Sequence, residues 1–314
     1  MARALGVTTL DGWTPIRVHE RPEPVVEWCW TDGAAFDDPS FVQSIENALK
    51  RPFSLLFRQE TPIEVLDALA PGLRPSGFVL HGSRCGSTLV SRMLATLPGC
   101  LVVSEPPPID HVLRVRASDA ERVRWLRGVV SALGRPRTEL RAYVLKLDAW
   151  AACNLGTLRA AFPDVPWVFL FRDPLHVLVS QFRQRGAHMV PGALDPHLFG
   201  LEPDAVARMP PEEYCARVLA AIYRAALEHR DGASHFVDYA ELPEAVTSRI
   251  LGAFELECDD AARARMHEVT AFDSKNPHVF FTADDRTKEH DASPALRDAA
   301  DRWVRPLYEE LRTC

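Results

Sequence analysis

Residue types that bind a phosphate or sulfate group gather in one short stretch, GSRCGST, which runs from Gly82 to Thr88. Its two glycines permit positive φ angles and let backbone N–H groups approach an anion closely. Arg84 adds a cation, and Ser87 and Thr88 add hydroxyl donors. The positive end of a helix that starts here would face the same anion. The stretch therefore predicts an anion site, although a glycine turn without a ligand has the same local pattern.

The loop of nucleoside triphosphate-binding proteins has four residues between its glycines, followed by Lys and then Ser or Thr. Here three residues separate Gly82 from Gly86, and Ser87 follows directly without a lysine. An ATP-dependent kinase with an altered loop remains an alternative. It would need magnesium ligands, and Asp148 and Asp173 are the obvious candidates at predicted strand ends.

Two charged residues that end or follow apolar runs are candidates for proton transfer and charge stabilisation. Glu105 is followed by three prolines, which restrict the backbone and predict a rigidly held carboxylate. The alternative is that Glu105 caps a turn or pairs with a surface arginine. Lys146 closes an apolar run beside the predicted anion loop and is a candidate for a role in the site. The alternative for Lys146 is an ammonium group that reaches solvent at the sheet edge.

A second candidate for anion binding is Arg172. It follows the apolar run 167–171 and precedes Asp173 and Pro174, where a proline suits the first turn of a helix. Ser180 comes eight residues after Arg172. An arginine fork and a hydroxyl at this separation can converge on one phosphate. A helix-capping turn is the alternative.

The elements that must position these residues alternate between strands and helices from residue 77 onward. This alternation predicts an α/β fold with a mainly parallel sheet and helices on both faces. In such a sheet, ligands bind beyond the carboxyl ends of the strands, where the residues described above lie. The predicted strands are 78–81, 100–103, 143–146, 167–171 and 235–239, and the clearest predicted helices are 119–133 and 212–229.

Residues 1–75 are predicted to form an N-terminal extension packed on a main domain of residues 76–314. The boundary is placed at the proline-rich turn 71–75. Aromatic residues in the extension are predicted to pack against the main domain, with an acceptor surface as the alternative. The extension is expected to contain short strands at 13–18 and 25–30 and helices at 39–50 and 62–69.

Composition limits the functions that the chain can have. With 314 residues, 47% of them hydrophobic, it is long enough to bury a large core. Lys and Arg number 36 against 43 Asp and Glu, and the net charge of -7 argues against general nucleic-acid binding. No apolar stretch reaches the roughly 18 residues of a membrane span, and the chain start lacks an apolar signal core. We therefore expect a cytoplasmic protein.

Cysteine and histidine spacing predicts neither disulfides nor a metal site. The seven cysteines are scattered and never form a CxxC pair, which is typical of reduced thiols. The 11 histidines show no HExxH or comparable ligand spacing.

Together the motifs resemble those of sulfotransferases that use 3′-phosphoadenosine-5′-phosphosulfate (PAPS). In that family, a Lys or Arg, a small residue, a Gly and two hydroxyl residues form the 5′-phosphosulfate loop. An Arg, an Asx-Pro pair and a later Ser bind the 3′-phosphate. The resemblance covers about residues 77–312 and implies the P-loop sulfotransferase architecture. A glutamate like Glu105 is typical of the protein-tyrosine and bacterial branch, because cytosolic small-molecule enzymes usually use histidine.

This resemblance implies a role for each candidate residue. Glu105 would accept the proton of the acceptor, while Arg84 and Lys146 stabilise charge on the sulfuryl group and the departing phosphate. Cys85 and Ser87 stand where many family members have Ser and Thr, so one hydroxyl contact at Cys85 is in doubt. The residues implied to bind PAPS are Arg84, Cys85, Gly86, Ser87, Thr88, Arg172, Ser180 and Lys288.

Two further segments are candidates for ligand contact. A loop before the last helix often closes over PAPS in the family, and the segment 274–288 contains Ser274, Arg286 and Lys288. The interval 184–200 has no clear periodicity and is an acceptor-loop candidate with His188 and His197, the alternative being an ordinary surface loop.

The sequence thus predicts an enzyme that moves a sulfuryl group from PAPS to an acceptor hydroxyl, in preference to an amine. The acceptor would be a small molecule or a peptide, and the product would be adenosine 3′,5′-bisphosphate. No metal is expected. An ATP-dependent kinase and a non-catalytic nucleotide-binding protein remain the alternatives.

Overall fold

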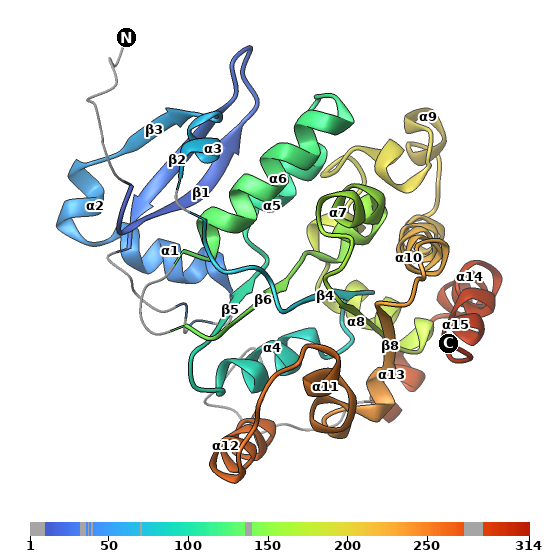
Figure 1. The fold of residues 1–314 in the computed structure, drawn as a ribbon. Coiled ribbons are helices and arrows are strands. Elements are labelled where there is room, and N and C mark those ends of the chain that lie inside the picture. Colours follow the sequence, from blue (N-terminus) through green and yellow to red (C-terminus); the bar gives the residue numbers. More distant parts are fainter. Residues whose placement is uncertain are drawn as a thin grey trace.

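Five parallel strands form the central sheet of the protein in a computed structural model of the chain (Figure 1). The strand order is β5-β6-β4-β7-β8. The structure describes residues 10–31, 36, 38, 40–69, 71–135, 140–272 and 285–314, with only the backbone for 285–287. The strands are β4 (Gly77–His81), β5 (Cys100–Ser104), β6 (Ala142–Lys146), β7 (Trp167–Phe171) and β8 (Ser234–Asp238).

Helices cover both faces of this sheet, as the sequence predicts. Alternate residues of one strand enter different cores, because Phe78 and Leu80 belong to one buried cluster and Val79 to the other. The cluster around Val79 includes residues of α4 (Ser87–Ala95), η5 (Val246–Ile250), α11 (Leu251–Ala253) and α12 (Asp260–Thr270), which lie below the sheet in Figure 1. The larger cluster includes residues of α5 (Pro107–Arg114), α6 (Asp119–Leu133), α7 (Leu155–Ala161), α8 (Pro174–Arg183), α10 (Pro211–Glu228), α14 (Pro294–Trp303) and α15 (Arg305–Leu311).

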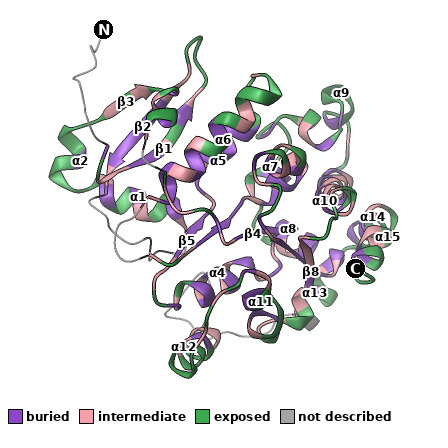
Figure 2. Cartoon of the chain, viewed as in Figure 1, coloured by how far each residue is buried: buried purple, intermediate pink, exposed green. Residues whose placement is uncertain are grey.

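The central strands are uninterrupted apolar runs because both of their faces are covered. Every residue of β4 and β7 is buried. Figure 2 shows the strands mostly buried and the surrounding helices exposed on their outer sides. None of the described helices combines the length and the hydropathy that a membrane span needs.

Local capping signals place the helix ends close to where the sequence predicts them. The helix α6 has the predicted bounds, because Ser118 and Glu121 form a capping box at its start. The helix α8 begins at Pro174, and Asp173 accepts hydrogen bonds from the first free N–H groups. The other short helices after β4 are η1 (Ala149–Asn154), η2 (Ala187–Met189), η3 (Pro196–Phe199), α9 (Pro203–Val206), η4 (Tyr239–Glu241) and α13 (Asp285–Asp291).

A three-stranded antiparallel sheet of β1 (Trp13–His19), β2 (Val25–Trp30) and β3 (Gln59–Pro62) lies in the N-terminal part. The backbone N–H of Val18 in β1 donates to Nδ1 of His111 in α5 at 3.2 Å. Val18, Val26 and Trp28 join the larger buried cluster, so this sheet shares a core with the central one. The short helices beside it are α1 (Phe41–Leu49), α2 (Pro52–Leu56) and α3 (Val65–Ala68).

The sequence prediction is wrong at one point in this region. A helix was expected over 62–69, but Pro62 ends the edge strand β3 and only Val65–Ala68 is helical. The short strand 59–62 has an alternating burial pattern over four residues, which is too few for a clear sequence signal. The division between residues 1–75 and 76–314 stays a prediction.

Gly77 is the residue that brings β4 close to Phe254, which is 2% exposed. A Cβ at Gly77 would lie 2.3 Å from Cδ1 of that ring. We expect Gly77→Ala to lower the free energy of unfolding by about 1–3 kcal/mol through overpacking. Gly252→Ala is a matched control, because nothing lies within 4 Å of its added Cβ. Urea unfolding measures both, and equal stabilities of the two variants would contradict this account of the packing.

Candidate active site

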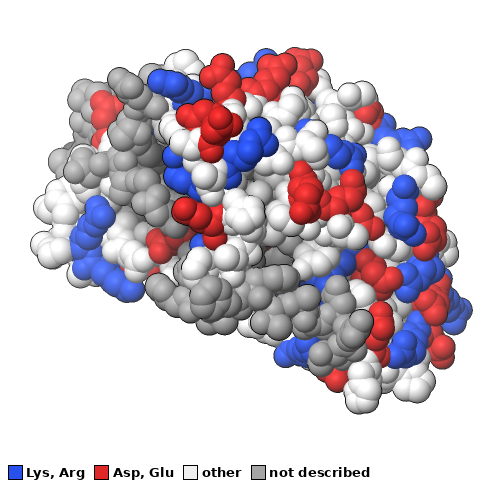
Figure 3. Space-filling model, turned by 90° about the horizontal axis from the view of Figure 1, so that it is seen from below, with Lys and Arg blue, Asp and Glu red and all other residues white. Residues whose placement is uncertain are grey.

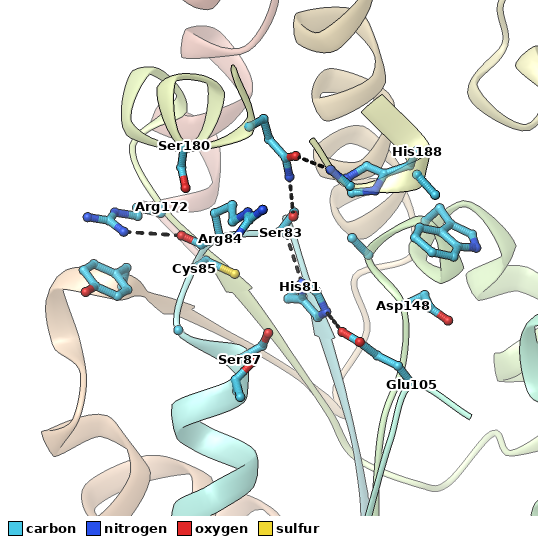
Figure 4. A pocket seen from close by; sticks show the side chains of 18 of the residues that line it. His81, Ser83, Arg84, Cys85, Ser87, Glu105, Asp148, Arg172, Ser180 and His188 are labelled. Carbon is cyan, nitrogen blue, oxygen red and sulfur yellow. Dashed lines mark hydrogen bonds and ion pairs between the residues drawn. The ribbon is translucent and has the colours of Figure 1, made fainter. Parts of the chain in front are cut away.

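One cavity of about 490 Å³ lies at the carboxyl ends of the five parallel strands. Each strand contributes a lining residue at or just after its end. The order of the sheet places β4 between β6 and β7, so the loop after β4 occupies the middle of this edge. The strand-end residues in the cavity wall are His81, Glu105, Asp148, Arg172 and Tyr239. Most of these side chains are drawn in Figure 4.

The loop after β4 has the backbone geometry of an anion cradle. Ser83, Arg84 and Gly86 have φ angles of 68°, 51° and 80°, all in the left-handed region. Successive N–H groups in such turns point into one concavity. Gly82 allows a close approach to Tyr223, since a Cβ there would lie 2.2 Å from Cε1 of that ring. Ser87 then begins α4, whose N-terminal end completes the cradle.

The side chains of Arg84 and Cys85 also hold this loop in place. Arg84 donates a hydrogen bond to the carbonyl oxygen of Gln184, and burial lowers its pKa. The thiol of Cys85 donates to the carbonyl oxygen of Leu170 in β7 at 3.1 Å. Burial raises the pKa of Cys85 to about 12. The raised pKa favours the protonated thiol, which can donate this hydrogen bond.

Arg172 and Ser180, the two residues of the second predicted anion site, both line this cavity. The guanidinium of Arg172 lies 3.8 Å from the ring centroid of Tyr239 and donates to the carbonyl oxygen of Arg84 at 3.4 Å. The hydroxyl of Tyr223 donates to the Arg172 carbonyl at 2.7 Å and accepts from its N–H at 3.2 Å. Contacts to the backbone of Arg172 and to its guanidinium thus both hold this residue at the end of β7.

Glu105 forms an ion pair with Lys146, in which Nζ lies 2.8 Å from Oε1. Glu105 has a φ of 55°, a strained value for a residue that is not glycine. Burial by itself would raise the pKa of Glu105, but Lys146 and His81 outweigh it and hold this pKa well below its usual range. Lys146 is 2% exposed and is not among the residues that line the cavity. It therefore lies behind Glu105 and does not point into the open site.

Sequence reasoning missed His81, which ends β4 and is 5% exposed. The N–H of Ser83 donates to Nδ1 of His81 at 3.0 Å. Because Nδ1 accepts, the proton of the neutral imidazole is on Nε2, which lies 3.5 Å from Oε1 of Glu105. Burial lowers the pKa of His81 and so favours this neutral form. A histidine at a strand end directly before a glycine loop was the available signal.

Gln181 was also missed, because it lies within the apolar run of α8 and is fully buried there. Its Nε2 donates to the hydroxyl of Ser83 at 2.7 Å, and its Oε1 accepts from the N–H of Gly186 at 2.8 Å. One amide thus connects the anion loop to the segment that follows α8.

The cavity wall contains most of the residues that the sequence predicts, with Lys146 directly behind it. Lys288 lines it from α13 and is 5% exposed. His188 also lines it and is 3% exposed, so the surface-loop alternative is wrong for that residue, while His197 is exposed. Ser274 and the side chain of Arg286 lie outside the described residues.

The two aspartates that a magnesium-dependent kinase would need do not lie together in the cavity wall. Asp148 lines the cavity, but Asp173 does not. Asp173 instead caps α8 through Oδ1 and pairs with Arg305 through Oδ2. Within the part of the chain that the structure describes, no group of three or more His, Cys, Asp and Glu side chains is arranged to hold a metal ion.

Charge on the outer surface gives no comparable signal. On the described part of the face in Figure 3, acidic and basic side chains are interspersed and do not form one large patch. Among the described residues, Arg84, Arg172 and Lys288 are the Arg and Lys residues that line the cavity.

Comparison with known proteins finds sulfotransferases among solved structures. The sulfotransferase domain of the Synechococcus PCC 7002 olefin synthase is 17% identical, with a TM-score of 0.43, over 78% of this chain and 95% of that one. A Mycobacterium avium sulfotransferase is 15% identical, with a TM-score of 0.44, over 77% and 79%. A mouse sulfotransferase complexed with PAP is 14% identical, with a TM-score of 0.40, over 79% and 87%. A scan against protein-family models and a search of curated proteins find no match.

The buried imidazole of His188 predicts a dependence of stability on pH. Burial is the largest cause that lowers the pKa of His188 from 6.5 to about 3, and the charge of Arg84 lowers this pKa further. Between these values the unfolded chain binds one more proton than the folded one, so stability falls as the pH falls. This group should account for about 2 kcal/mol lost between about pH 7 and about pH 5.

Urea unfolding of the wild-type protein and His188→Phe at both pH values checks this expectation. The variant should lose about 2 kcal/mol less than the wild type over the interval. The same loss in both proteins would show that His188 is not held neutral.

Proposed function

We propose that this protein is a PAPS-dependent sulfotransferase that transfers a sulfuryl group to an acceptor hydroxyl. The observation that carries the proposal is the meeting of two anion-binding groups and one ionised carboxylate in a single cavity. The loop around Gly86 is one anion site, and Arg172 with Ser180 is the other. Glu105 supplies the carboxylate. A donor with separate 5′- and 3′-phosphate groups matches this pair of sites.

The donor would bind through its two phosphate groups. The backbone N–H groups of the loop, the hydroxyls of Ser87 and Thr88 and the N-terminal end of α4 hold the 5′-phosphosulfate. Arg172 and Ser180 hold the 3′-phosphate. Lys288 adds a cation from α13. The comparison with a mouse sulfotransferase complexed with PAP supports this choice of nucleotide.

Transfer forms one bond to sulfur and breaks another. The acceptor oxygen attacks the sulfur atom, and the bond between sulfur and the bridging phosphate oxygen breaks, leaving its electron pair on adenosine 3′,5′-bisphosphate. The loop N–H groups and Arg84 offset the charge that develops on that phosphate. The acceptor proton passes to Glu105. The protein supplies position and charge, and no covalent intermediate with a side chain is required.

Glu105 suits this task although its low pKa makes it a weak base. Its ionised state leaves it able to accept a hydrogen bond from the acceptor hydroxyl before reaction. As the bond to sulfur forms, the acceptor oxygen becomes positive and strongly acidic, so a weak base is sufficient. Lys146 holds the carboxylate in place through its ion pair, and Nε2 of His81 lies 3.5 Å from the same oxygen. In this account Lys146 acts on Glu105 and not directly on the sulfuryl group.

We expect adenosine 3′,5′-bisphosphate to bind much more tightly than AMP, which lacks the 3′-phosphate. A charge-assisted hydrogen bond contributes about 1.5–3 kcal/mol, or roughly ten- to a hundredfold in affinity. Arg172→Ala should erase most of this preference. Arg208→Ala, at an exposed position outside the cavity, is the matched control and should keep it. Isothermal titration calorimetry measures the six affinities, and equal binding of both nucleotides to the wild type would reject the 3′-phosphate site.

Glu105→Gln should lower turnover by about a hundredfold to ten-thousandfold, because the amide keeps the shape but cannot take a proton. Its affinity for adenosine 3′,5′-bisphosphate should stay near that of the wild type. Glu268→Gln, an exposed substitution in α12, controls for the loss of one charge. Sulfuryl transfer to a phenolic acceptor is the measurement. Near-normal turnover of Glu105→Gln would show that the base is another residue.

A further inference from the structure

His188 has a position in the cavity that the reaction described above does not use. It lies in the short turn η2, where the N–H of Met189 donates to the carbonyl oxygen of Gly186 at 2.9 Å. Its ring lies against Trp150, with the ring centroids 5.4 Å apart and the planes inclined by 40°. Gly186 makes room for it, since a Cβ there would lie 2.9 Å from Cε1 of His188. Backbone and neighbours therefore hold the imidazole at the cavity wall.

Neither ring nitrogen of His188 has a hydrogen-bond partner among the described residues, and both are buried. Buried polar atoms in folded proteins almost always have such a partner. Gln181, whose amide lies nearby, already bonds to Ser83 and Gly186. A neutral imidazole has one N–H donor and one acceptor nitrogen to satisfy. A ligand in the cavity is the natural source of at least one partner.

The side of the cavity that contains His188 differs in charge from the side with the predicted anion-binding residues. Figure 4 shows His188, Asp148 and Glu105 on one side and Arg172 with Ser180 on the other. Burial lowers the pKa of His188 to about 3, which keeps its ring neutral. Burial, followed by repulsion from Glu105, raises the pKa of Asp148 well above its ordinary value and favours its neutral form. The charge of Glu105 is balanced by Lys146.

The number of lone pairs on the atom that receives the sulfuryl group decides which chemical group can bind between Glu105 and His188. A hydroxyl oxygen has one proton and two lone pairs. It can donate its proton to Glu105, accept from the His188 N–H with one lone pair and attack sulfur with the other. A neutral amine has a single lone pair, which the attack on sulfur consumes. A carboxylate in this place would be repelled by Glu105.

We propose that His188 binds the acceptor directly, donating a ring N–H to the hydroxyl oxygen that receives the sulfuryl group, and that the acceptor is an uncharged alcohol or phenol. This inference rests on the proposed sulfotransferase function and adds the acceptor class to it. Ala149, Trp150 and Ala187 line the same side and provide apolar surface for the body of such a molecule.

The test uses the whole protein saturated with adenosine 3′,5′-bisphosphate, so that an acceptor binds without reacting. The probes are 4-methylphenol, 2-naphthol and 4-methylcyclohexanol, together with 4-methylaniline as the amine of the same shape as 4-methylphenol. Titrations are performed at a pH where all four are uncharged. The variants are His188→Phe, which keeps a ring beside Trp150 but lacks both nitrogens, and His197→Phe as the exposed control.

We expect the wild type to bind at least one hydroxyl probe and, when PAPS replaces the bisphosphate, to transfer the sulfuryl group to 4-methylphenol faster than to 4-methylaniline. His188→Phe should weaken hydroxyl binding by roughly three- to tenfold and lower the ratio of the phenol rate to the amine rate. His197→Phe should behave as the wild type. In wild-type protein with ¹⁵N-labelled histidines, the hydroxyl probe should shift the ring signals of His188, a readout that does not depend on the variant folding.

Several results would overturn the inference. They are the failure of all three hydroxyl probes to bind, equal affinities in the wild type and His188→Phe, faster transfer to the amine than to the phenol, or unchanged His188 ring signals. Loss of bisphosphate binding by the wild type is a different result, because it would reject the sulfotransferase proposal itself.

Discussion

The ion pair between Lys146 and Glu105 is the interaction on which the cavity depends. Lys146 ends β6 in a buried position, and its ammonium lies 2.8 Å from the carboxylate that follows β5. Removing one partner of such a pair leaves an uncompensated buried charge, which typically costs about 3–5 kcal/mol. Replacing both by apolar residues is often neutral or stabilising, so stability alone does not explain the pair. Its effect is to hold an ionised carboxylate in a cavity wall that also contains the cationic side chains of Arg84, Arg172 and Lys288.

Three residues with a strained backbone conformation line the same cavity. Ser83, Arg84 and Glu105 have positive φ angles, and each such residue costs roughly 1–3 kcal/mol. Among the described residues one further non-glycine residue, Glu255, has a positive φ, and it does not line this cavity. The rest of the fold must supply the compensating stability. The fully buried strands β4 and β7, covered by two apolar clusters, are where that stability resides.

The shared direction of the strands explains how the residues proposed for donor binding and those proposed for acceptor binding come to lie close together. The anion loop, the arginine after β7 and the carboxylate after β5 all lie at one edge, because the five strands share a direction. Gln181 then ties the loop at Ser83 to Gly186, next to His188. Donor binding and acceptor binding, as proposed, would therefore be adjacent and mechanically connected through a single buried amide.

The sequence by itself determined the strand–loop–helix unit at Gly82–Thr88, the parallel α/β class and the strand-end positions of Glu105 and Arg172, because local periodicity and glycine spacing carry that information. Only the tertiary structure decided that Lys146 lies behind Glu105, that His81 presents Nε2 to it, and that His188 is buried and His197 exposed. These outcomes depend on contacts between β4, β5, β6 and the segment after α8, which are distant in the chain. Periodicity along one segment cannot specify which side chains of other segments it meets.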